Sequence, residues 1–480
     1  MAIGTVAVGG LAGLSGCGSD DDDDNGQTPG ASVEFSHGVA SGDPLSHRVI
    51  LWTRASTAAE GLELQWQIAT DRGFVNVVNS GTVQASAESD HTAKVDATGL
   101  APNTVYYYRF RFGDRVSPIG RTKTLPTGSV TQVKLAVFSC SNYPAGFFNV
   151  YAEAAKMGDL DAAVHLGDYI YQYARGGYAH EQAAELGRES LPETEIIALA
   201  DYRARHAQYR SDADLQALHA AVPMIAVWDD HEISNDTWMN GAENHQATEG
   251  DFADRKKAAL QAYFEWMPVR QPDANRSDRI YRSFDFGNLV SLHMLDTRLI
   301  GREQQLDLTS YVGAGGSFDG AAFTADVGRP DRQLLGSEQT DWLQTQLQGS
   351  SATWQVLGQQ VLMGRMNVPA PVLFNILSGG QQGVPLDQYS ALLQKAQTAP
   401  GSLTPQGQAI LAQPPVPYTL YAWDGYQAAR ETVLGMAATM DKNLVVLAGD
   451  THNAWASDLA LSGGQAVGVG FATSSGSSPR

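Results

Sequence analysis

The sequence predicts an α/β fold preceded by a β-sandwich. Between residues 33 and 127, apolar residues recur with a period of two, which is typical of strands buried on one face. After residue 128, strand patterns are separated by helical patterns, and several apolar runs end abruptly at acidic or histidine residues. Ligands bind at the carboxyl ends of strands in an open α/β sheet, so these ends mark a candidate site.

Composition bounds the possible functions. The chain has 480 residues, of which 43% are hydrophobic, so it can form two or more domains with large cores. It contains 32 Lys and Arg against 52 Asp and Glu, and the net charge of −20 disfavours a specific nucleic-acid partner. The two cysteines, Cys17 and Cys140, lie in unrelated contexts, so we expect no structural disulfide.

Residues 1–32 are predicted to be a lipoprotein-type signal and an acidic tether, outside the fold. The apolar residues 3–14 lead into LSGC (14–17) and then five aspartates, a pattern that resembles a bacterial lipoprotein signal with a lipidated cysteine. The alternative is a disordered tail with an incidental cysteine. No Lys or Arg precedes the apolar run, so the n-region of the signal is expected to be incomplete. The run is shorter than the about 20 apolar residues of a membrane-spanning helix. We expect export to the periplasm or cell surface, with a lipid anchor at Cys17.

Residues 33–127 are predicted to form a fibronectin-III-like β-sandwich. Segment 62–68 places its apolar side chains on one face, and turn residues separate such runs. The segment LAPNTVYYYRF (100–110) resembles a strand entry of fibronectin type III domains. Its tyrosines are expected to form sandwich core and one corner hydrogen bond rather than to bind a ligand. Residues 120–131 are interpreted as the linker.

Residues 128–480 are predicted to form the catalytic domain, because strands alternate here with helices. The helical patterns cover residues 147–157, 198–218 and 252–267. A second group of strands, which would complete a two-sheet core, is expected in residues 281–298 and 353–363. Segments 301–340 and 375–418 are rich in Gly, Gln, Pro and Ser, and we interpret them as surface excursions rather than domains.

Four apolar runs end at residues that could ligate metal ions. These residues are Cys140, Asp168, Tyr171, Asp230, His231, Asp450 and His452. In VWDDHEISND (227–236), adjacent carboxylates cannot both stay ionised in an apolar site unless the strand end is wet or holds a cation. Asp168 can bridge two cations about 4 Å apart through its two oxygens.

The type of ligand indicates the type of metal. An unperturbed phenol has a pKa of about 10, so a tyrosine ligand such as Tyr171 favours Fe(III) over Zn or Mg. A Cys140 thiolate fits the same ion, although the alternative for Cys140 is a buried structural thiol. His165 and His293 lie within strand patterns and are expected to pack or to support ligands.

The motifs of the chain occur in an order that resembles a known family. They are GVASGDP (38–44), LWTR (51–54), FSCSN (138–142), LGDYIY (166–171), VWDDHEISND (227–236), LDTR (295–298), GQQ (358–360) and AGDTHNAWASDL (448–459). Together they resemble the PhoD-type alkaline phosphatases of the calcineurin-like metallophosphatase superfamily, over residues 33–475. The resemblance implies an N-terminal β-sandwich followed by a four-layer αββα metallophosphatase domain. It also implies further strands after GFATSSGSSPR (470–480).

The resemblance implies a secreted metal-dependent phosphoesterase with Fe(III) and Ca(II) as cofactors. Such an enzyme releases phosphate from phosphomonoesters and phosphodiesters by a metal-bound hydroxide. The implied Fe(III) ligands are Cys140, Asp168, Tyr171 and His452. The implied Ca(II) ligands are Asp168, Asp230 and Asp450.

Two further residues have implied catalytic roles. His231 is placed to protonate the leaving oxygen, and the alternative is a structural partner of Asp229 or Glu232. Asn235 is a second candidate for metal or phosphate contact. Asp229 is expected to orient His231 rather than to bind metal.

Two other functions are compatible with parts of the sequence. An adhesion protein with an inert α/β body is disfavoured, because none of the seven ligand residues is missing. A phospholipase D-like or nucleotide-cleaving phosphodiesterase on the same scaffold stays open, because substrate choice depends on segments 301–340 and 375–418. In either enzyme the partners are phosphate esters, and we expect a monomer.

Overall fold

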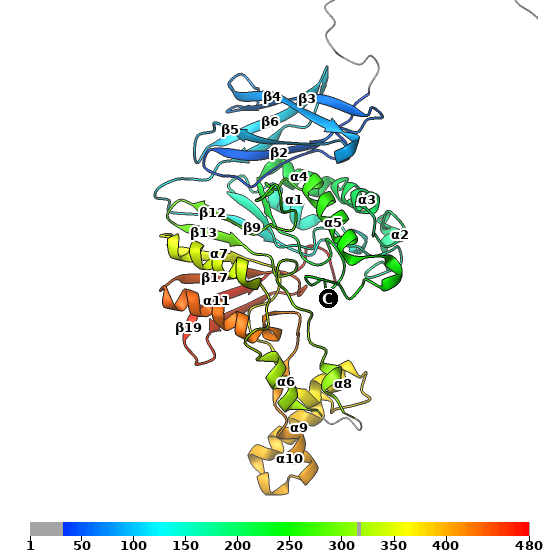
Figure 1. Ribbon diagram of the computed structural model, residues 1–480, viewed down its shortest axis with the longest axis vertical. Coiled ribbons are helices and arrows are strands. Elements are labelled where there is room, and N and C mark those ends of the chain that lie inside the picture. The colour runs from blue at the N-terminus through cyan, green and yellow to red at the C-terminus, as the bar shows by residue number, and fades with distance from the viewer. Residues whose placement is uncertain (1–31, 314–317, 480) are drawn as a thin grey trace, which may run out of the picture.

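The computed structural model describes residues 32–313 and 318–479. The predicted signal and Cys17 lie outside the described residues. Figure 1 shows a β-sandwich at one end of the molecule, an α/β body in the middle and a helical protrusion at the other end. No helix within the described ranges is long and apolar enough to cross a membrane.

The sandwich consists of two layers of strands. The first layer contains β1 (Val39–Gly42), β2 (Arg48–Arg54) and β5 (Thr92–Thr98). The second contains β3 (Gly61–Ala69), β4 (Val77–Ser86), β6 (Val105–Phe112), β7 (Arg115–Val116) and β8 (Gly120–Lys123). Side chains from both layers, such as Leu51 and Tyr108, form one buried cluster. The predicted corner hydrogen bond is present, because the Ala101 N–H donates to Tyr106 Oη at 2.8 Å.

The linker begins later than the sequence predicted. Residues 120–123 pair with β6 in strand β8, so the connection to the body starts at Thr124. A side chain at Gly120 would place its Cβ 2.2 Å from Tyr108 Cζ, so glycine here permits close strand packing. The sequence instead predicts that this glycine belongs to the linker.

One sandwich sheet continues into the body. Strand β1 pairs in parallel with β11 (Met224–Ala226), with Gly42 opposite Met224. The resulting six-stranded sheet has the order β5-β2-β1-β11-β10-β9. Strand β2 is therefore buried on both faces, and Trp52 packs against Trp266 with ring centroids 5.8 Å apart. The two predicted domains thus share a sheet.

Two sheets form the centre of the body. The first adds β9 (Leu135–Phe138) and β10 (Ala162–His165) to β11. The second, in order, contains β12 (Arg282–Phe286), β13 (Val290–Met294), β14 (Trp354–Gly358), β17 (Asn443–Ala448), β19 (Ala466–Ala472) and β18 (Trp455–Ala460). The two predicted strand regions, 281–298 and 353–363, therefore both lie in one second sheet, as expected.

Helices accompany each sheet (Figure 1). On the first side they are α1 (Asn149–Ala155), α2 (Ala183–Leu186), α3 (Leu199–Arg210), α4 (Ala213–Ala221) and α5 (Phe252–Trp266). On the second they are α7 (Gly336–Gly349) and α11 (Gln427–Thr439). The predicted helix 198–218 is two helices, because the Asp212 carboxylate accepts from the N–H groups of Asp214 and Leu215 and caps a new helix.

The two predicted excursions come together in one structure, which we call the protrusion (residues 306–313, 318–327 and 366–420). Its elements are α6 (Gly320–Val327), β15 (Asn367–Pro369), α8 (Ala370–Leu377), α9 (Leu386–Thr398), α10 (Pro405–Leu411) and β16 (Pro415–Pro417). It has a buried apolar cluster of its own, to which Phe323, Leu373 and Leu420 contribute. The protrusion projects from the body, as expected, but it is folded rather than irregular.

Candidate metal centre

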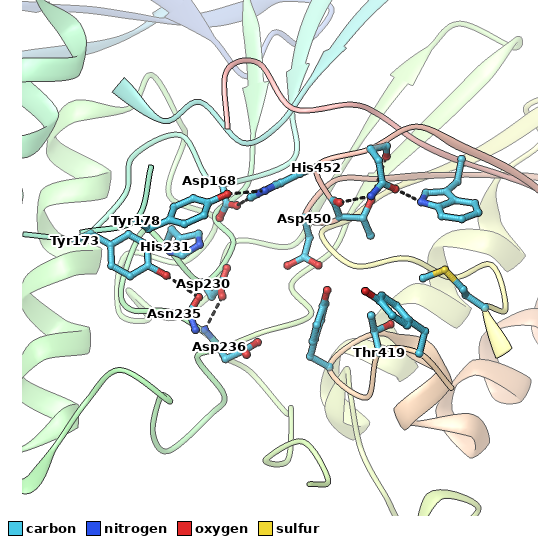
Figure 2. Close-up of a pocket in the computed structure, with 16 residues that line it drawn as sticks. Asp168, Tyr173, Tyr178, Asp230, His231, Asn235, Asp236, Thr419, Asp450 and His452 are labelled. Atoms are coloured by element: carbon cyan, nitrogen blue, oxygen red, sulfur yellow. Dashed lines mark hydrogen bonds and ion pairs between the residues drawn. The ribbon is translucent and has the colours of Figure 1, made fainter. Parts of the chain in front are cut away.

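All the predicted ligands meet at one edge of the two sheets. Cys140 follows β9, Asp168 and Tyr171 follow β10, and Asp230 and His231 follow β11. These three strands are parallel, so their carboxyl ends lie together. The end of β17 in the second sheet adds the remaining two ligands, Asp450 and His452. Figure 2 shows the labelled side chains converging on one pocket.

The ligand atoms form three overlapping groups. Within each group, the candidate atoms all lie within 4.8 Å of one another. The groups are Cys140, Asp168 and His452; Asp168, Asp230 and His231; and Asp229, Asp230 and Asp450. Asp168 belongs to two groups, which is the arrangement expected of a bridging carboxylate. Tyr171 Oη lies 3.1 Å from both Asp168 Oδ2 and His452 Nε2, beside the first group.

The backbone is unusual at these positions. Cys140, Asp168, Asp450 and His452 have φ angles of 60°, 56°, 63° and 56°, in the left-handed region. Residues other than glycine adopt this region uncommonly, and such conformations cluster at functional sites. Four of the predicted ligands therefore occupy strained turns at the strand ends.

The electrostatics of the site fit bound cations. Asp168 Oδ1, Asp230 Oδ1 and Asp450 Oδ2 are buried without a hydrogen-bond partner among the described residues. Burial, with Asp230 and Asp168 nearby, raises the pKa of Asp450 to about 6 although Arg298 opposes the shift. Burial and Asp168 also raise the pKa of the Cys140 thiol. Cations between these groups would satisfy the oxygens and favour the ionised forms, so the donor set suits metal ions.

Arg298 is a charged residue of the site to which the sequence assigned no role. Its guanidinium is fully buried and pairs with Asp229 and, at 2.6 Å, with Asp450 Oδ1. Asp230 Oδ1 lies 3.5 Å away. Asp229, expected to orient His231, thus pairs with Arg298 instead. The single positive charge of Arg298 balances only part of the negative charge of the surrounding carboxylates, and bound cations could balance the rest.

Glu232 holds two of the ligand loops together. Its buried carboxylate accepts the backbone N–H groups of Asp168, Tyr169 and Asp229. The first two follow β10 and the third follows β11, so one side chain sets the spacing of both strand ends. Glu232 is therefore a partner of the backbone and not of His231.

Comparison with known proteins identifies the family. A family model described as "PhoD-like phosphatase" matches residues 135–480, and the model of its N-terminal domain matches residues 21–126. The chain belongs to the PhoD-like phosphatase family. It is 38% identical over 443 residues to alkaline phosphatase D of Bacillus subtilis (strain 168), covering 89% of this chain and 66% of that protein.

A solved structure supports the same assignment. The structure described as "Structure of PhoD" matches with a TM-score of 0.74 and 35% identity, covering 92% of this chain and 77% of that chain. The predicted resemblance and the predicted fold class, a β-sandwich followed by an αββα domain, are confirmed. The chain spans slightly less than two thirds of the length of the Bacillus relative.

The two predicted catalytic residues of this PhoD-like chain both line the pocket. The His231 ring stacks on Tyr171 with centroids 4.2 Å apart, and His231 Nδ1 lies 2.7 Å from Gln172 Oε1. The amide oxygen can only accept, so Nδ1 carries a proton and Nε2 is left for the pocket. Asn235 Oδ1 accepts from Tyr173 Oη at 3.0 Å, and its amide nitrogen donates to Glu243 at 2.9 Å.

Residues 478 and 479 also reach the site. Ser478 Oγ donates to Tyr171 Oη at 2.7 Å, and the Pro479 carbonyl oxygen lies 2.6 Å from His452 Nδ1. A carbonyl oxygen can only accept, so His452 Nδ1 carries a proton, and its Nε2 faces Asp168 and Tyr171. A partner of this kind fixes the tautomer of a metal-binding histidine.

The pocket has a volume of about 300 Å³ and extends beyond the ligands. Tyr173, Tyr178 and Asp236 also line its ligand side. The opposite side is lined by residues at or just after the base of the protrusion and by residues in the turn before β18 or at the start of that strand: Met366, Tyr418, Thr419, Tyr421, Thr451, Asn453 and Trp455. Of these, the sequence analysis included only the last three, as part of a family motif. Tyr418 ends the segment 375–418, which resembles an irregular excursion in composition; Thr419 and Tyr421 follow that segment closely, and Met366 precedes it.

Proposed function

We propose that this PhoD-like protein is a metal-dependent phosphoesterase that releases phosphate from phosphomonoesters and phosphodiesters. The observation that carries this proposal is that six of the seven predicted ligands fall into three overlapping groups of candidate ligand atoms, two of which share Asp168, with Tyr171 beside the first group. Two neighbouring cations are the usual means of holding a phosphate and neutralising the charge of its displacement. The names of the family and of the Bacillus relative, a phosphatase in both cases, support the same activity.

We propose Fe(III) and Ca(II) as the metals. Cys140 and Tyr171 are donors that suit a trivalent ion, and they accompany Asp168 and His452. The oxygens of Asp168, Asp230 and Asp450 suit calcium, which prefers carboxylate ligands. When bound, the two metals supply Lewis acidity that activates water and positive charge that holds phosphate oxygens.

The chain's own side chains would act around the bound phosphate. His231 presents Nε2 to the pocket while Gln172 accepts from Nδ1–H, so the imidazolium form of the ring is oriented to donate its Nε2 proton to the leaving oxygen. Its nitrogen also lies in one ligand group with Asp168 and Asp230, which is compatible with a ligand role. Asn235 lies on the same side of the pocket and could contact phosphate through its amide.

The test compares Asp168→Asn with wild-type protein on p-nitrophenyl phosphate and bis-(p-nitrophenyl) phosphate. We expect the variant to lose roughly 10²-fold or more in kcat, because the charge that holds both cations is reduced. Asp458→Asn, an exposed position on β18, is the matched control and should keep its activity. Activity of the wild type in excess chelator, or full activity of Asp168→Asn, would contradict the proposal.

We further propose that the protein is exported, lipid-anchored at Cys17 and monomeric. The LSGC motif and the following aspartates support the anchor. Cys17→Ala, expressed from the full natural start, should move the protein from the membrane fraction to the soluble fraction without changing its activity on soluble esters. A wild-type protein that is already soluble and unlipidated would contradict the anchor.

A further inference from the structure

The pocket has a second wall, which contains none of the predicted metal ligands. It is formed by Met366, Tyr418 and Thr419 at the base of the protrusion, by Tyr421 just after it, and by Trp455 at the start of β18. Figure 2 shows Thr419 across the pocket from Asp168 and His231. We call these five residues the aromatic wall. A substrate held at the metals would face it.

Two large aromatic side chains of this wall are exposed to solvent. Tyr418 is 37% exposed and Trp455 is 38% exposed, although both line a concave site. Scattered exposed aromatics need no explanation, but two in one pocket beside the metal ligands form a surface for a ring. Aromatic side chains bind planar rings by stacking, and the contact tolerates different rings because each has a π-face.

The indole of Trp455 is held in place. Its Nε1–H donates to Asn453 Oδ1, and the Asn453 amide donates in turn to the Thr451 carbonyl oxygen at 2.7 Å. This turn follows Asp450 directly and contains His452, both predicted ligands. The indole therefore has a fixed position relative to the metal centre, and little side-chain entropy remains to be lost on binding.

The aromatic wall also differs in charge from the side of the pocket that carries the predicted ligands. Residues 366–420 contain one acidic and one basic residue, Asp387 and Lys395, in a chain that is 18% charged. The facing side contributes Asp168, Asp230 and Asp450. A phosphate therefore has its cationic partners on one side, and the other side suits an uncharged group.

The volume of the pocket also indicates that it holds more than a phosphate group. A phosphate group has five non-hydrogen atoms, whereas a volume of about 300 Å³ lies at the lower end of the range for sites that bury drug-sized ligands. The space beyond the metals accommodates the organic part of an ester. Thr419, Thr451 and Asn453 supply polar groups at its edge.

We propose that the aromatic wall binds the alcohol-derived part of the substrate and selects esters that carry a planar ring, with nucleoside monophosphates as the class that fits. This inference rests on the proposed phosphoesterase function. A nucleobase would stack on Trp455 and Tyr418 while its phosphate lies at the metal ligands. Esters of similar chemistry that lack the ring would bind the same metals without this contact.

The test uses adenosine 5′-monophosphate and ribose 5-phosphate. Both release a primary C5 oxygen of ribose, so the leaving groups have similar basicity and the main difference is the nucleobase. We expect wild-type kcat/KM to be higher for the nucleotide by roughly 5- to 100-fold, the usual range for one base–aromatic contact. Trp455→Ala and Tyr418→Ala should each remove much of this preference and leave ribose 5-phosphate within about twofold of wild type, whereas Trp455→Phe should keep most of it.

Trp354→Ala is the matched control. Trp354 is 43% exposed at the start of β14, the opposite end of that strand from the metal centre, so its loss should not change the preference. The metal content of Trp455→Ala is measured as well, because the residue is close to His452 in the chain. A wild-type enzyme without preference, or an equal loss on both esters in Trp455→Ala with its metals intact, would overturn the proposal.

A binding measurement separates this inference from the proposed function. If the metal-loaded wild type hydrolyses neither ester, the phosphoesterase function fails, and calorimetric titration with the two esters still tests the wall. Tighter binding of the nucleotide in wild type, lost in Trp455→Ala, would support the wall. Equal affinities for the two esters would refute it whether or not hydrolysis occurs.

Discussion

Replacing Arg298 by methionine should destabilise the protein most strongly when no metal is bound. The guanidinium is fully buried between Asp229 and Asp450, with Asp230 3.5 Å away. Its removal leaves buried carboxylates without a counter-charge, and breaking a buried ion pair in this way costs about 3–5 kcal/mol. Bound calcium would replace part of the lost positive charge. The loss in free energy of unfolding should therefore shrink at saturating calcium.

Arg302→Met is a control with the same substitution four residues later. Arg302 is also fully buried, but its guanidinium nitrogens have no hydrogen-bond partner within residues 32–313 and 318–479. It lies over the Tyr426 ring at 5.4 Å. Asp236 and Asp230 act on Arg302 only through the field, without a hydrogen bond, and its removal also relieves the burial of a charge, so we expect a change below about 1 kcal/mol.

Urea unfolding of the wild type and both variants, with chelator and with calcium, measures the two effects. The expected result is a large loss for Arg298→Met in chelator, a smaller loss in calcium, and little change for Arg302→Met in either condition. Equal losses for the two variants would show that the carboxylate contacts of Arg298 do not set its contribution. An Arg298→Met loss that calcium does not reduce would show that packing, rather than charge, is responsible.

Three further predictions follow from the site and the core. Tyr171→Phe should remove the visible absorption of a phenolate–iron charge transfer while calcium stays bound, as checked by spectroscopy and elemental analysis; a colourless, iron-containing and fully active wild type would contradict the assignment. His231→Ala should lower turnover of an alkyl phosphate by about 10²- to 10⁴-fold but that of a nitrophenyl phosphate much less, since nitrophenolate departs without a proton; equal losses would indicate a metal- or phosphate-binding role. Burial, with Arg210 nearby, lowers the pKa of His206 to about 3, so the unfolded chain takes up a proton below pH 6.5 that the folded chain does not. Stability should therefore fall as the pH drops from about 6.5 towards 3, by about 2 kcal/mol at pH 5, and urea unfolding of His206→Gln should show a correspondingly smaller loss between pH 7 and 5.

The convergence of the candidate ligand residues could be predicted because their signal is local. An apolar run that stops at Asp168 or Asp230 marks the end of a strand, independently of the rest of the chain. In an open α/β sheet, ligands bind at the carboxyl ends of the strands, so residues at these ends are expected to lie close together. Helix and strand positions followed from periodicity in the same way. The break between α3 and α4 was missed because Asp212, a strong helix cap, lies inside an otherwise continuous helical pattern.

The remaining parts of the site depend on contacts between distant segments. Arg298 has a role only because Asp229, Asp230 and Asp450, from two different sheets, surround it. The aromatic wall arises where residues 366, 418, 419 and 421, at or next to the base of a protrusion that has its own apolar cluster, lie across the pocket from the strand ends. Neither the contacts of Arg298 nor the position of the aromatic wall produces a period or a fixed spacing in the sequence from which it could be predicted.

The shared sheet makes the sandwich a structural part of the metal centre rather than an appendage. Asp43, directly after β1, is fully buried and binds Arg282 of β12 at 2.6 Å, while the same guanidinium donates to the Ala226 carbonyl oxygen of β11 at 2.8 Å. One ion pair therefore connects the sandwich, the first sheet and the second sheet, just before the β11 end that carries Asp230. Without the sandwich, β11 would lose its β1 neighbour and become an edge strand with unpaired backbone groups, and Arg282 would lose its counter-charge. The spacing between Asp230 and the predicted ligands of the second sheet thus depends on residues far from the pocket. This dependence arises from the pairing of β1 with β11, and no ligand motif in the sequence reveals it.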